Sequence, residues 1–365
     1  MKPVSWLRPH LADYSVTTLA VFLCLSVLTA CSTVPSRLEF KIRASDAERV
    51  WPTLPEVPRY RYVGELTGES NFSSAETSDS PFNSAWRWLA GLGKDHRNPK
   101  VLQRPQGVMV DSTGRILVTD VSRQAVFDFD VNRGELNIWE WARPGVRFVA
   151  PIGIVAGRDG EVLVADAELA RVFRLDKKGR YLGEMGKNIL RRPTGLARDP
   201  KRGLIYVADT RAHDVKIFND QGKLVDTLGK RGDGPGEFNA PTYLSFAGNK
   251  LYVSDTLNAR IQVFDTRGKF LRSIGERGPY VGNLNRPKGV AADDEGNIYI
   301  VESYRDHLLI FNANGDFLLP IGGTGQGVGE FYLPAGVCVD QHNRIYVADM
   351  FNGRVEVFQY LGERE

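Results

Sequence analysis

Six acidic residues recur at nearly even spacing and are the first candidates for chemistry in this sequence. Each ends a short apolar run, and successive acids lie 43 to 47 residues apart. They are Asp120, Asp166, Asp209, Asp255, Glu302 and Asp349. A carboxylate can serve as a metal ligand or a general acid, but one that recurs in every unit is better explained by side-chain hydrogen bonds to the backbone of its own loop. We therefore expect these acids to be structural, with Arg171, Arg260 or Arg354 as candidate partners.

Residues that differ between the units are better candidates for a binding site. Most of them follow the acids, and two others lie just after prolines that recur in every unit. These candidates are Arg123, Arg211, His213, Tyr243, Lys288, Tyr304, Arg305 and His307. Together they would form a polar, partly basic and aromatic mouth suited to an anionic or sugar-like ligand, or to a loop of a partner protein. Solvated surface residues without a ligand are the alternative.

The elements that must position these residues are short β-strands. Each acid lies 14 to 16 residues after a recurring proline, and a second apolar run begins six residues after the acid. Runs such as LIYVAD are rich in β-branched and aromatic residues, are too short for helices, and are bounded by turn formers. Four antiparallel strands per unit, repeated six times, predict an all-β, six-bladed β-propeller of four-stranded blades. In propeller strand order, the loops that carry the candidates share one face.

The last unit shows how the ring closes. Only QYLGERE follows Phe358, which is too little for a normal fourth strand. RYVGELTG at residues 61–68 is similar to RYLGEMG at 180–186, the fourth strand of the second unit. We therefore predict that an N-terminal strand completes the last blade, which would also cover an edge that otherwise invites aggregation.

The sequence offers little to a metal ion or a catalytic group. The residue after each recurring proline, at the mouth of the central channel, is not acidic in any unit: Gln106, Ile152, Thr194, Thr242, Lys288 and Ala335. His213 and His307 occupy non-equivalent positions, and two histidines are fewer than the three protein ligands of a catalytic zinc. Glycine-rich GDGPGEF and GGTGQGVGEF lie between units with no helical pattern after them, so they are expected to be turns. We expect no catalytic residue and no cofactor, with a divalent metal in the channel as the alternative.

The repeat resembles a known family. LYVSDTLNARIQVFD at residues 251–265 resembles the NHL repeat, and the likeness extends over roughly residues 60–360. It implies a six-bladed propeller but not a function, since NHL-like propellers are found in binding proteins and a few enzymes. Gluconolactonase-like enzymes are similar in architecture and hold a divalent metal in the channel, and a propeller amidating lyase uses histidines. Nothing here resembles the RING or B-box modules of RNA-binding NHL proteins.

Residues 1–30 are typical of a lipoprotein signal peptide. Lys2 and Arg8 precede an apolar run over 16–28, and LTAC ends that run at Cys31. This end resembles a bacterial lipobox, in which the cysteine is lipidated; an ordinary signal peptide or an uncleaved anchor is the alternative. Ser32 follows the cysteine at a position where an aspartate would favour retention at the inner membrane. The resemblance therefore implies an exported outer-membrane lipoprotein, and it leaves undecided whether the protein faces the periplasm or the cell surface.

Charge and domain organisation complete these expectations. The net charge is +3, and this near-balance in an exported chain argues against nucleic acid as a partner. Residues 31–59 are expected to be a lipidated tether, since WPTLPEVPRY favours a semi-rigid spacer. The propeller would occupy 60–365, with 69–103 as a long connecting segment into the first blade. In that segment, Trp86 and Trp88 belong to a short helix that either packs on the ring or serves as an exposed aromatic anchor.

These observations favour a non-catalytic, lipid-anchored envelope propeller, which binds or scaffolds a partner protein or glycan through one loop face. The alternative is a metal-dependent propeller hydrolase, lactonase or lyase that acts on a small exported substrate.

Overall fold

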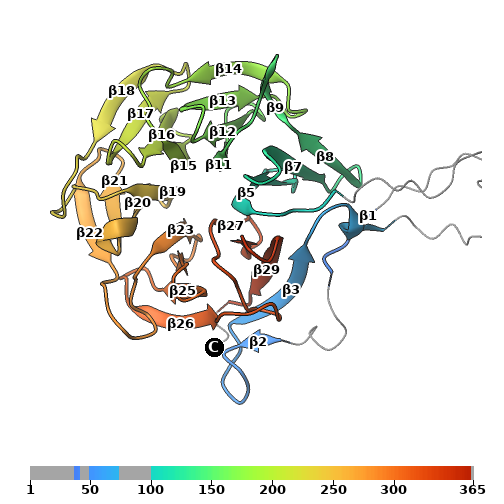
Figure 1. Ribbon diagram of the computed structural model, residues 1–365. Helices are drawn as coiled ribbons and strands as arrows, with labels where there is room; N and C mark the ends of the chain where they lie inside the picture. Colours follow the sequence, from blue (N-terminus) through green and yellow to red (C-terminus); the bar gives the residue numbers. More distant parts are fainter. Residues whose placement is uncertain (1–36, 42–48, 74–99, 363–365) are drawn as a thin grey trace, which may run out of the picture.

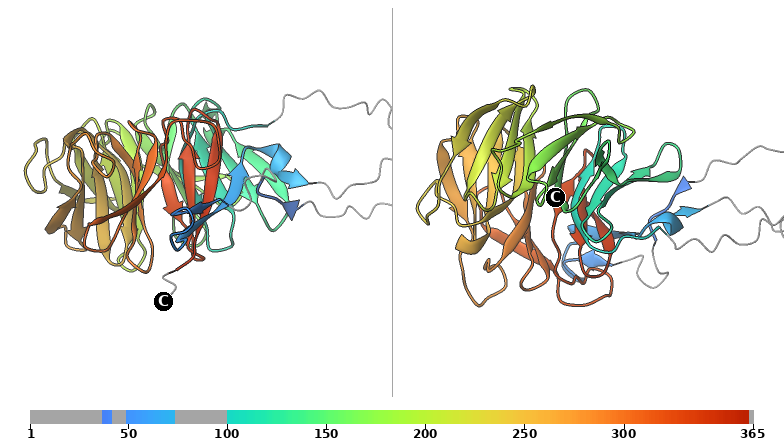
Figure 2. Two further views of the ribbon diagram at one scale, coloured as in Figure 1. Left: turned by 90° about the horizontal axis from the view of Figure 1, so that it is seen from below. Right: turned by 45° about the horizontal axis from the view of Figure 1, so that its top comes forward.

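Six sheets are arranged radially around a common axis in the computed structural model, which describes residues 37–41, 49–73 and 100–362. Figure 1 shows the ring along its axis, and Figure 2 shows it from the side as a flattened disc. The predicted all-β, six-bladed propeller is therefore confirmed. The signal peptide, Cys31, Trp86 and Trp88 lie outside the described residues.

The first five blades each consist of four consecutive antiparallel strands. Blade 1 consists of β5 (Pro105–Val110), β6 (Ile116–Asp120), β7 (Ala125–Asp130) and β8 (Glu135–Trp139). Blade 2 consists of β11 (Pro151–Ala156), β12 (Val162–Asp166), β13 (Arg171–Leu175) and β14 (Tyr181–Met185). Blade 3 consists of β15 (Pro193–Asp199), β16 (Leu204–Asp209), β17 (Asp214–Asn219) and β18 (Leu224–Leu228). Blade 4 consists of β19 (Pro241–Ala247), β20 (Lys250–Asp255), β21 (Arg260–Asp265) and β22 (Phe270–Ile274). Blade 5 consists of β23 (Pro287–Ala292), β24 (Ile298–Glu302), β25 (His307–Phe311) and β26 (Phe317–Gly322).

The sixth blade joins the two ends of the described chain. It contains β27 (Val337–Val339), β28 (Arg344–Asp349) and β29 (Arg354–Tyr360), and β3 (Tyr60–Leu66) is its fourth strand. The register of β3 against β29 runs from Tyr60 opposite Tyr360 to Leu66 opposite Val355. Figure 1 shows the blue β3 beside the red β29, so the predicted N-terminal closure is confirmed.

Part of the expected spacer packs on the ring instead. Within residues 31–59, β2 (Val50–Trp51) pairs with β3, and β1 (Arg37–Leu38) pairs with β4 (Phe72–Ser73). The Trp51 side chain is only 8% exposed, and its ring lies edge-on to that of Phe358 at 5.5 Å. Burial of this large apolar ring outweighs the preference of the nearby prolines for an extended, solvated chain.

Apolar clusters between neighbouring blades hold the disc together. Phe218 lies in a cluster shared by blades 2 and 3, and Phe264 occupies the equivalent place between blades 3 and 4. The remaining regular elements are a hairpin between blades 1 and 2, formed by β9 (Trp141–Arg143) and β10 (Val146–Arg147), and two 3-10 turns at Glu69–Asn71 and Thr256–Asn258. None of the helical turns in the described ranges has the length and apolar character needed to cross a membrane.

Candidate functional site: the loop face around the channel

The recurring acids are buried at the ends of the second strands and hold the loops on one face. Asp120 is fully buried, and its Oδ2 accepts hydrogen bonds from the backbone N–H groups of Gln103 at 2.6 Å and Arg104 at 2.9 Å. Its Oδ1 accepts from Ser122 and Arg123, both at 2.9 Å. Asp120 therefore caps the loop before the first strand and the loop after the second strand together, which fixes both loops on the same face.

The same arrangement recurs with different partners in the other blades. Glu302 accepts from the backbone N–H groups of Asn285 at 2.6 Å and Tyr304 at 2.9 Å, so the longer side chain still points into its own loops. Asp255 binds Arg260 at 2.8 Å, and Asp349 binds Arg354 at 2.9 Å. The third candidate cation does not follow this pattern, since Arg171 pairs with Glu184 at 2.9 Å rather than with Asp166.

The central channel is closed by a side chain from blade 4. The second residue after the recurring proline is glycine in the other five blades, and this lets neighbouring blades approach closely at the channel. A Cβ atom on Gly153, for example, would lie 2.1 Å from the carbonyl oxygen of Thr194. Blade 4 has Tyr243 at this position, and its hydroxyl donates to the carbonyl oxygen of Gln106 on blade 1 at 3.3 Å. The cavity beside Tyr243 has a volume of about 40 Å³, which leaves room for water only.

Above Tyr243, the residues after the recurring prolines line the mouth of the channel. Thr194 shares a hydrogen bond of 2.7 Å with Thr210, the residue after the acid of its blade, and Thr242 shares one of 2.6 Å with Thr256. Lys288 occupies the equivalent position in blade 5. Its half-buried ammonium group has no hydrogen bond or ion pair among the described residues, and burial, with a contribution from the Arg286 charge, lowers its pKa to about 8.

Some of the remaining predicted site residues are exposed to solvent, and others form hydrogen bonds to the backbone of the protein itself. Arg211 and Tyr304 are exposed, and Tyr304 retains 67% of its accessible surface. His213 Nδ1 accepts from the backbone N–H of Ala240 at 3.1 Å, so this imidazole caps the loop of the next blade.

Three other predicted residues contact their own surroundings. Arg123 Nε donates to the carbonyl oxygen of Val101 at 2.9 Å, and His307 Nδ1 bonds the carbonyl oxygen of Arg305. Arg305 itself is half-buried. Arg211, Tyr304 and Arg305 therefore lie in loops on the same face as Lys288, whereas the hydroxyl of Tyr243 bonds across the channel to blade 1.

An aromatic and cationic group on this face was not among the predicted residues. The guanidinium of Arg104 lies 5.0 Å from the ring centre of Phe351, whose ring is 5.4 Å from that of Tyr332. Phe351 and Tyr332 are 43% and 46% exposed. The sequence signal was an arginine directly before the recurring proline, at Arg104, Arg192 and Arg286, in blades 1, 3 and 5.

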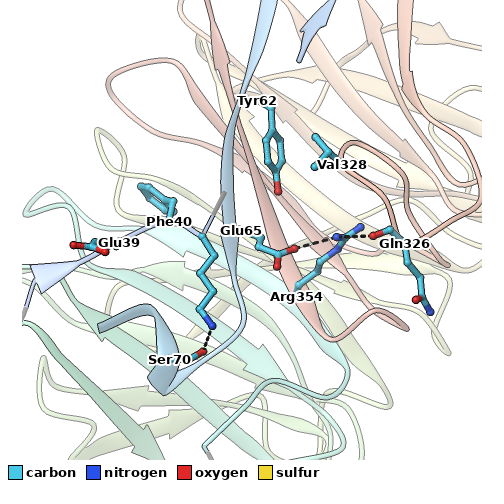
Figure 3. Close-up of a pocket in the computed structure, with 9 residues that line it drawn as sticks. Glu39, Phe40, Tyr62, Glu65, Ser70, Gln326, Val328 and Arg354 are labelled. Atoms are coloured by element: carbon cyan, nitrogen blue, oxygen red, sulfur yellow. Dashed lines mark hydrogen bonds and ion pairs between the residues drawn. The ribbon is translucent and has the colours of Figure 1, made fainter. Parts of the chain in front are cut away.

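A second cavity lies at the outer edge of the closing blade. It has a volume of about 520 Å³ and lies between the N-terminal segment and the loop before β27. Figure 3 shows Arg354 between Glu65 and Gln326. Lys41 Nζ donates to the Ser70 hydroxyl at 2.6 Å. Of these contacts, the bond from Arg354 of β29 to Glu65 of β3 joins two side chains across the closure of the ring. Among the residues that the structure describes, no group of three or more His, Cys, Asp or Glu side chains is placed to hold a metal ion.

Comparison with known proteins supports the fold. A family model described as a 6-bladed beta-propeller matches residues 199–245 and 283–363. Virginiamycin B lyase from Staphylococcus aureus is 16% identical, with a TM-score of 0.53 over 71% of this chain and 96% of that chain. A gluconolactonase from Xanthomonas campestris is 15% identical, with a TM-score of 0.54 over 71% of this chain and 86% of that chain. A luciferin-regenerating enzyme is 13% identical, with a TM-score of 0.56 over 72% of this chain and 92% of that chain. At these identities the likeness extends to the six-bladed propeller and not to the activities of those enzymes.

Proposed function

We propose that this chain is a non-catalytic, lipid-anchored envelope propeller that binds an acidic partner protein through the loop face around its closed channel. The observation that carries the proposal is the exposed aromatic and cationic group formed by Arg104, Tyr332 and Phe351. The exposed Tyr304 lies in another loop of the same face. Tyrosine and arginine are the side chains most often found at the energetic centres of protein interfaces. The surrounding loops are held rigidly by buried acids, so little entropy is lost when a partner binds.

Charge favours an acidic partner. Arg104, Arg211 and Arg286 are exposed on this face, and the mouth contains Lys288. Glu168 pairs with Arg192 at 2.5 Å and neutralises one further cation. A local excess of positive charge attracts and orients acidic surfaces even though the whole chain is nearly balanced.

The anchor determines how this face would be presented. In the proposal Cys31 carries the lipid, and only residues 32–36 separate it from β1. Six consecutive Cα–Cα steps extend at most roughly 20 Å. The outer edge of the ring where β1 pairs with β4 would therefore lie near the bilayer (Figure 1), which turns the loop face sideways, toward neighbours anchored in the same membrane.

The test is affinity capture from membranes with the full-length protein. Arg211→Ala, Tyr304→Ala and Phe351→Ala together should reduce the captured partner at least about tenfold, since two or three interface anchors are lost. The matched control is Lys178→Ala with Lys201→Ala, which removes exposed side chains from loops on the opposite face. Equal loss in both variants, or no loss in either, would remove the loop face from consideration.

The membrane part of the proposal has its own test. Cys31→Ala should release the protein from the membrane fraction and abolish incorporation of a labelled fatty acid. If the variant still sediments with membranes, the anchor lies elsewhere.

The enzyme alternative stays a prediction. Metal analysis of the purified protein tests it directly: one tightly bound divalent ion per chain, together with hydrolase or lyase activity that a chelator abolishes, would replace the binding function.

A further inference from the structure

The mouth of the channel contains a cation, Lys288, that has no counter-charge among the residues the structure describes. Lys288 is the second residue of β23, and its backbone carbonyl accepts a hydrogen bond from the Ser254 hydroxyl. The equivalent residues Thr194 and Thr242 point to the loops after the acids, which places the Lys288 side chain at the mouth as well.

The other polar groups of the mouth satisfy one another. Thr194 also donates to the carbonyl oxygen of Thr242 at 2.8 Å, and Gln106 Nε2 contacts Met350 Sδ at 2.7 Å. None of the six residues that follow the recurring prolines is acidic. The ring around Lys288 therefore supplies hydroxyl and amide groups that are already engaged, and no carboxylate.

Lys216 is another partly buried lysine of this chain, and it has a carboxylate partner. Its ammonium group lies 2.7 Å from the carboxylate of Asp214 on the same strand, and both side chains are largely buried. Removing a cation from water without such a partner costs free energy, which appears at Lys288 as a lowered pKa. Arg286 adds to this cost because a second positive charge lies close by.

We infer that Lys288 is the binding site for a single carboxylate group, brought by a ligand to the mouth of the closed channel. Tyr243 closes the channel below this site, so the carboxylate would approach from the loop face and stop at the mouth. The inference rests on the proposed function for the source of the group, which is either an acidic side chain of the partner or a free organic acid. The chemistry of recognition is the same in both cases: one ammonium group pairs with one carboxylate, and the exposed Arg286 contributes long-range attraction.

Titration of the Lys288 ammonium group by NMR tests this inference without knowledge of the partner. Succinate represents a free acid, an N-acetylated, C-amidated Glu-Glu peptide represents an acidic side chain, and inorganic phosphate is the anion control. We expect one or both carboxylate probes to saturate and to raise the pKa of Lys288 by about one unit, which corresponds to a tenfold preference for the charged form. Lys216, already paired, should not respond.

Variants define the outcomes further. Lys288→Met should abolish the saturable response, measured by calorimetry, and Lys216→Met should leave it unchanged. No saturation by either carboxylate probe, an equal response in Lys288→Met, or equally tight binding of phosphate would overturn the inference. If the loop-face variants lose the partner but the pKa of Lys288 does not respond to either carboxylate probe, the carboxylate site alone is overturned. If Lys288 binds a carboxylate probe but no partner is captured, the proposed function alone is overturned.

Discussion

Blades 4 and 6 are built on the same plan but differ in charge. Each is preceded by a glycine-rich loop, and in each an arginine at the start of the third strand binds the acid that ends the second strand. The distances are nearly equal, 2.8 Å for Arg260 to Asp255 and 2.9 Å for Arg354 to Asp349. The two blades differ two residues further along the third strand, where blade 4 has Gln262 and blade 6 has Glu356.

The side-chain amide of Gln262 is hydrogen-bonded to nearby backbone groups, whereas the side-chain oxygens of Glu356 are not. Gln262 Oε1 accepts from the backbone N–H of Gly236 at 2.8 Å, and its Nε2 donates to the carbonyl oxygen of Glu237 at 2.6 Å. Glu356 is fully buried and neither carboxylate oxygen has a hydrogen bond, although Arg354 lies 2.8 Å from Oε1 as a charge contact. Burial raises the pKa of Glu356 well above its usual range, which favours the protonated acid in the place where blade 4 has an amide.

The closing strand accounts for the difference. Glu65 of β3 lies directly opposite Glu356 and pairs with Arg354 at 3.0 Å, whereas Ser273 lies opposite Gln262 in blade 4. In blade 6 one guanidinium thus holds three carboxyl groups, and one of these comes from the strand that closes the ring. The closing strand, which comes from a distant part of the chain, is therefore held by an ion pair as well as by the backbone hydrogen bonds of the sheet. Because these charged groups titrate, we expect the stability of the closure to depend on pH.

Removing the closing strand should have the largest effect. Deletion of residues 60–66 takes the buried Tyr60, Tyr62 and Leu66 out of the core and leaves β29 as an open edge. Three such side chains stabilise the fold by about 1.5–3 kcal/mol each, so we expect the cooperative thermal transition to move down sharply or to disappear. Arg61→Ala changes an exposed residue of the same strand and serves as the control. An unchanged melting curve after the deletion would contradict closure by β3.

Removing the central guanidinium should come next. Arg354→Gln leaves the Asp349 carboxylate buried without a cation and also removes the contacts to Glu65 and Glu356, so it should cost about 3–5 kcal/mol, as expected when one partner of a buried ion pair is lost. Arg260→Gln leaves only Asp255 and should cost less. Urea unfolding of both variants measures the difference. Equal losses in the free energy of unfolding would mean that the extra carboxyl groups of blade 6 do not contribute to stability.

Exchanging the third-strand residues should give a smaller effect that depends on pH. The raised pKa of Glu356 means that its protonated form stabilises the fold below the unfolded value near 4.5, and that this contribution is lost as pH rises through the folded value. Glu356→Gln should therefore melt progressively higher than the wild type as the pH rises above the unfolded value. Gln262→Glu should show the reverse trend in blade 4. Parallel pH profiles for all three proteins would contradict a buried protonated acid.

The smallest effect is expected inside the channel, where blade 4 has Tyr243 and blade 6 has Gly336. Tyr243→Phe removes the hydrogen bond to Gln106 while keeping the ring, and should cost about 0.5–1.5 kcal/mol. Tyr304→Phe removes an exposed hydroxyl and should have no measurable effect on the free energy of unfolding. If the two variants unfold at the same urea concentration, the phenol contributes to closing the channel only by its shape.

The fold was predictable because its signals are local and repeated. A proline, an acid 14 to 16 residues later and the apolar runs beside them mark every blade, and the short fourth strand at the end of the chain requires a replacement from elsewhere. The capping role of Asp120 and its equivalents was also predictable from the sequence. An acid that recurs in every blade is best explained by hydrogen bonds to the loop backbone, which is the part that all blades share. For the site, the sequence identified Lys288, Arg211 and Tyr304 as candidates on one loop face but gave no means of ranking them.

What the sequence determined by itself is the ring, its closure and the face on which variable residues gather, because strand periodicity and turn chemistry act between residues close along the chain. Only the tertiary structure decided that Trp51 packs against Phe358 and that Tyr243 bonds across to Gln106. It also decided that Lys216 pairs with a carboxylate, whereas Lys288 meets none in the described part of the chain. Each of these depends on which atoms meet or fail to meet across blades. Burial and charge pairing are properties of that meeting, and no pattern along a single strand contains them.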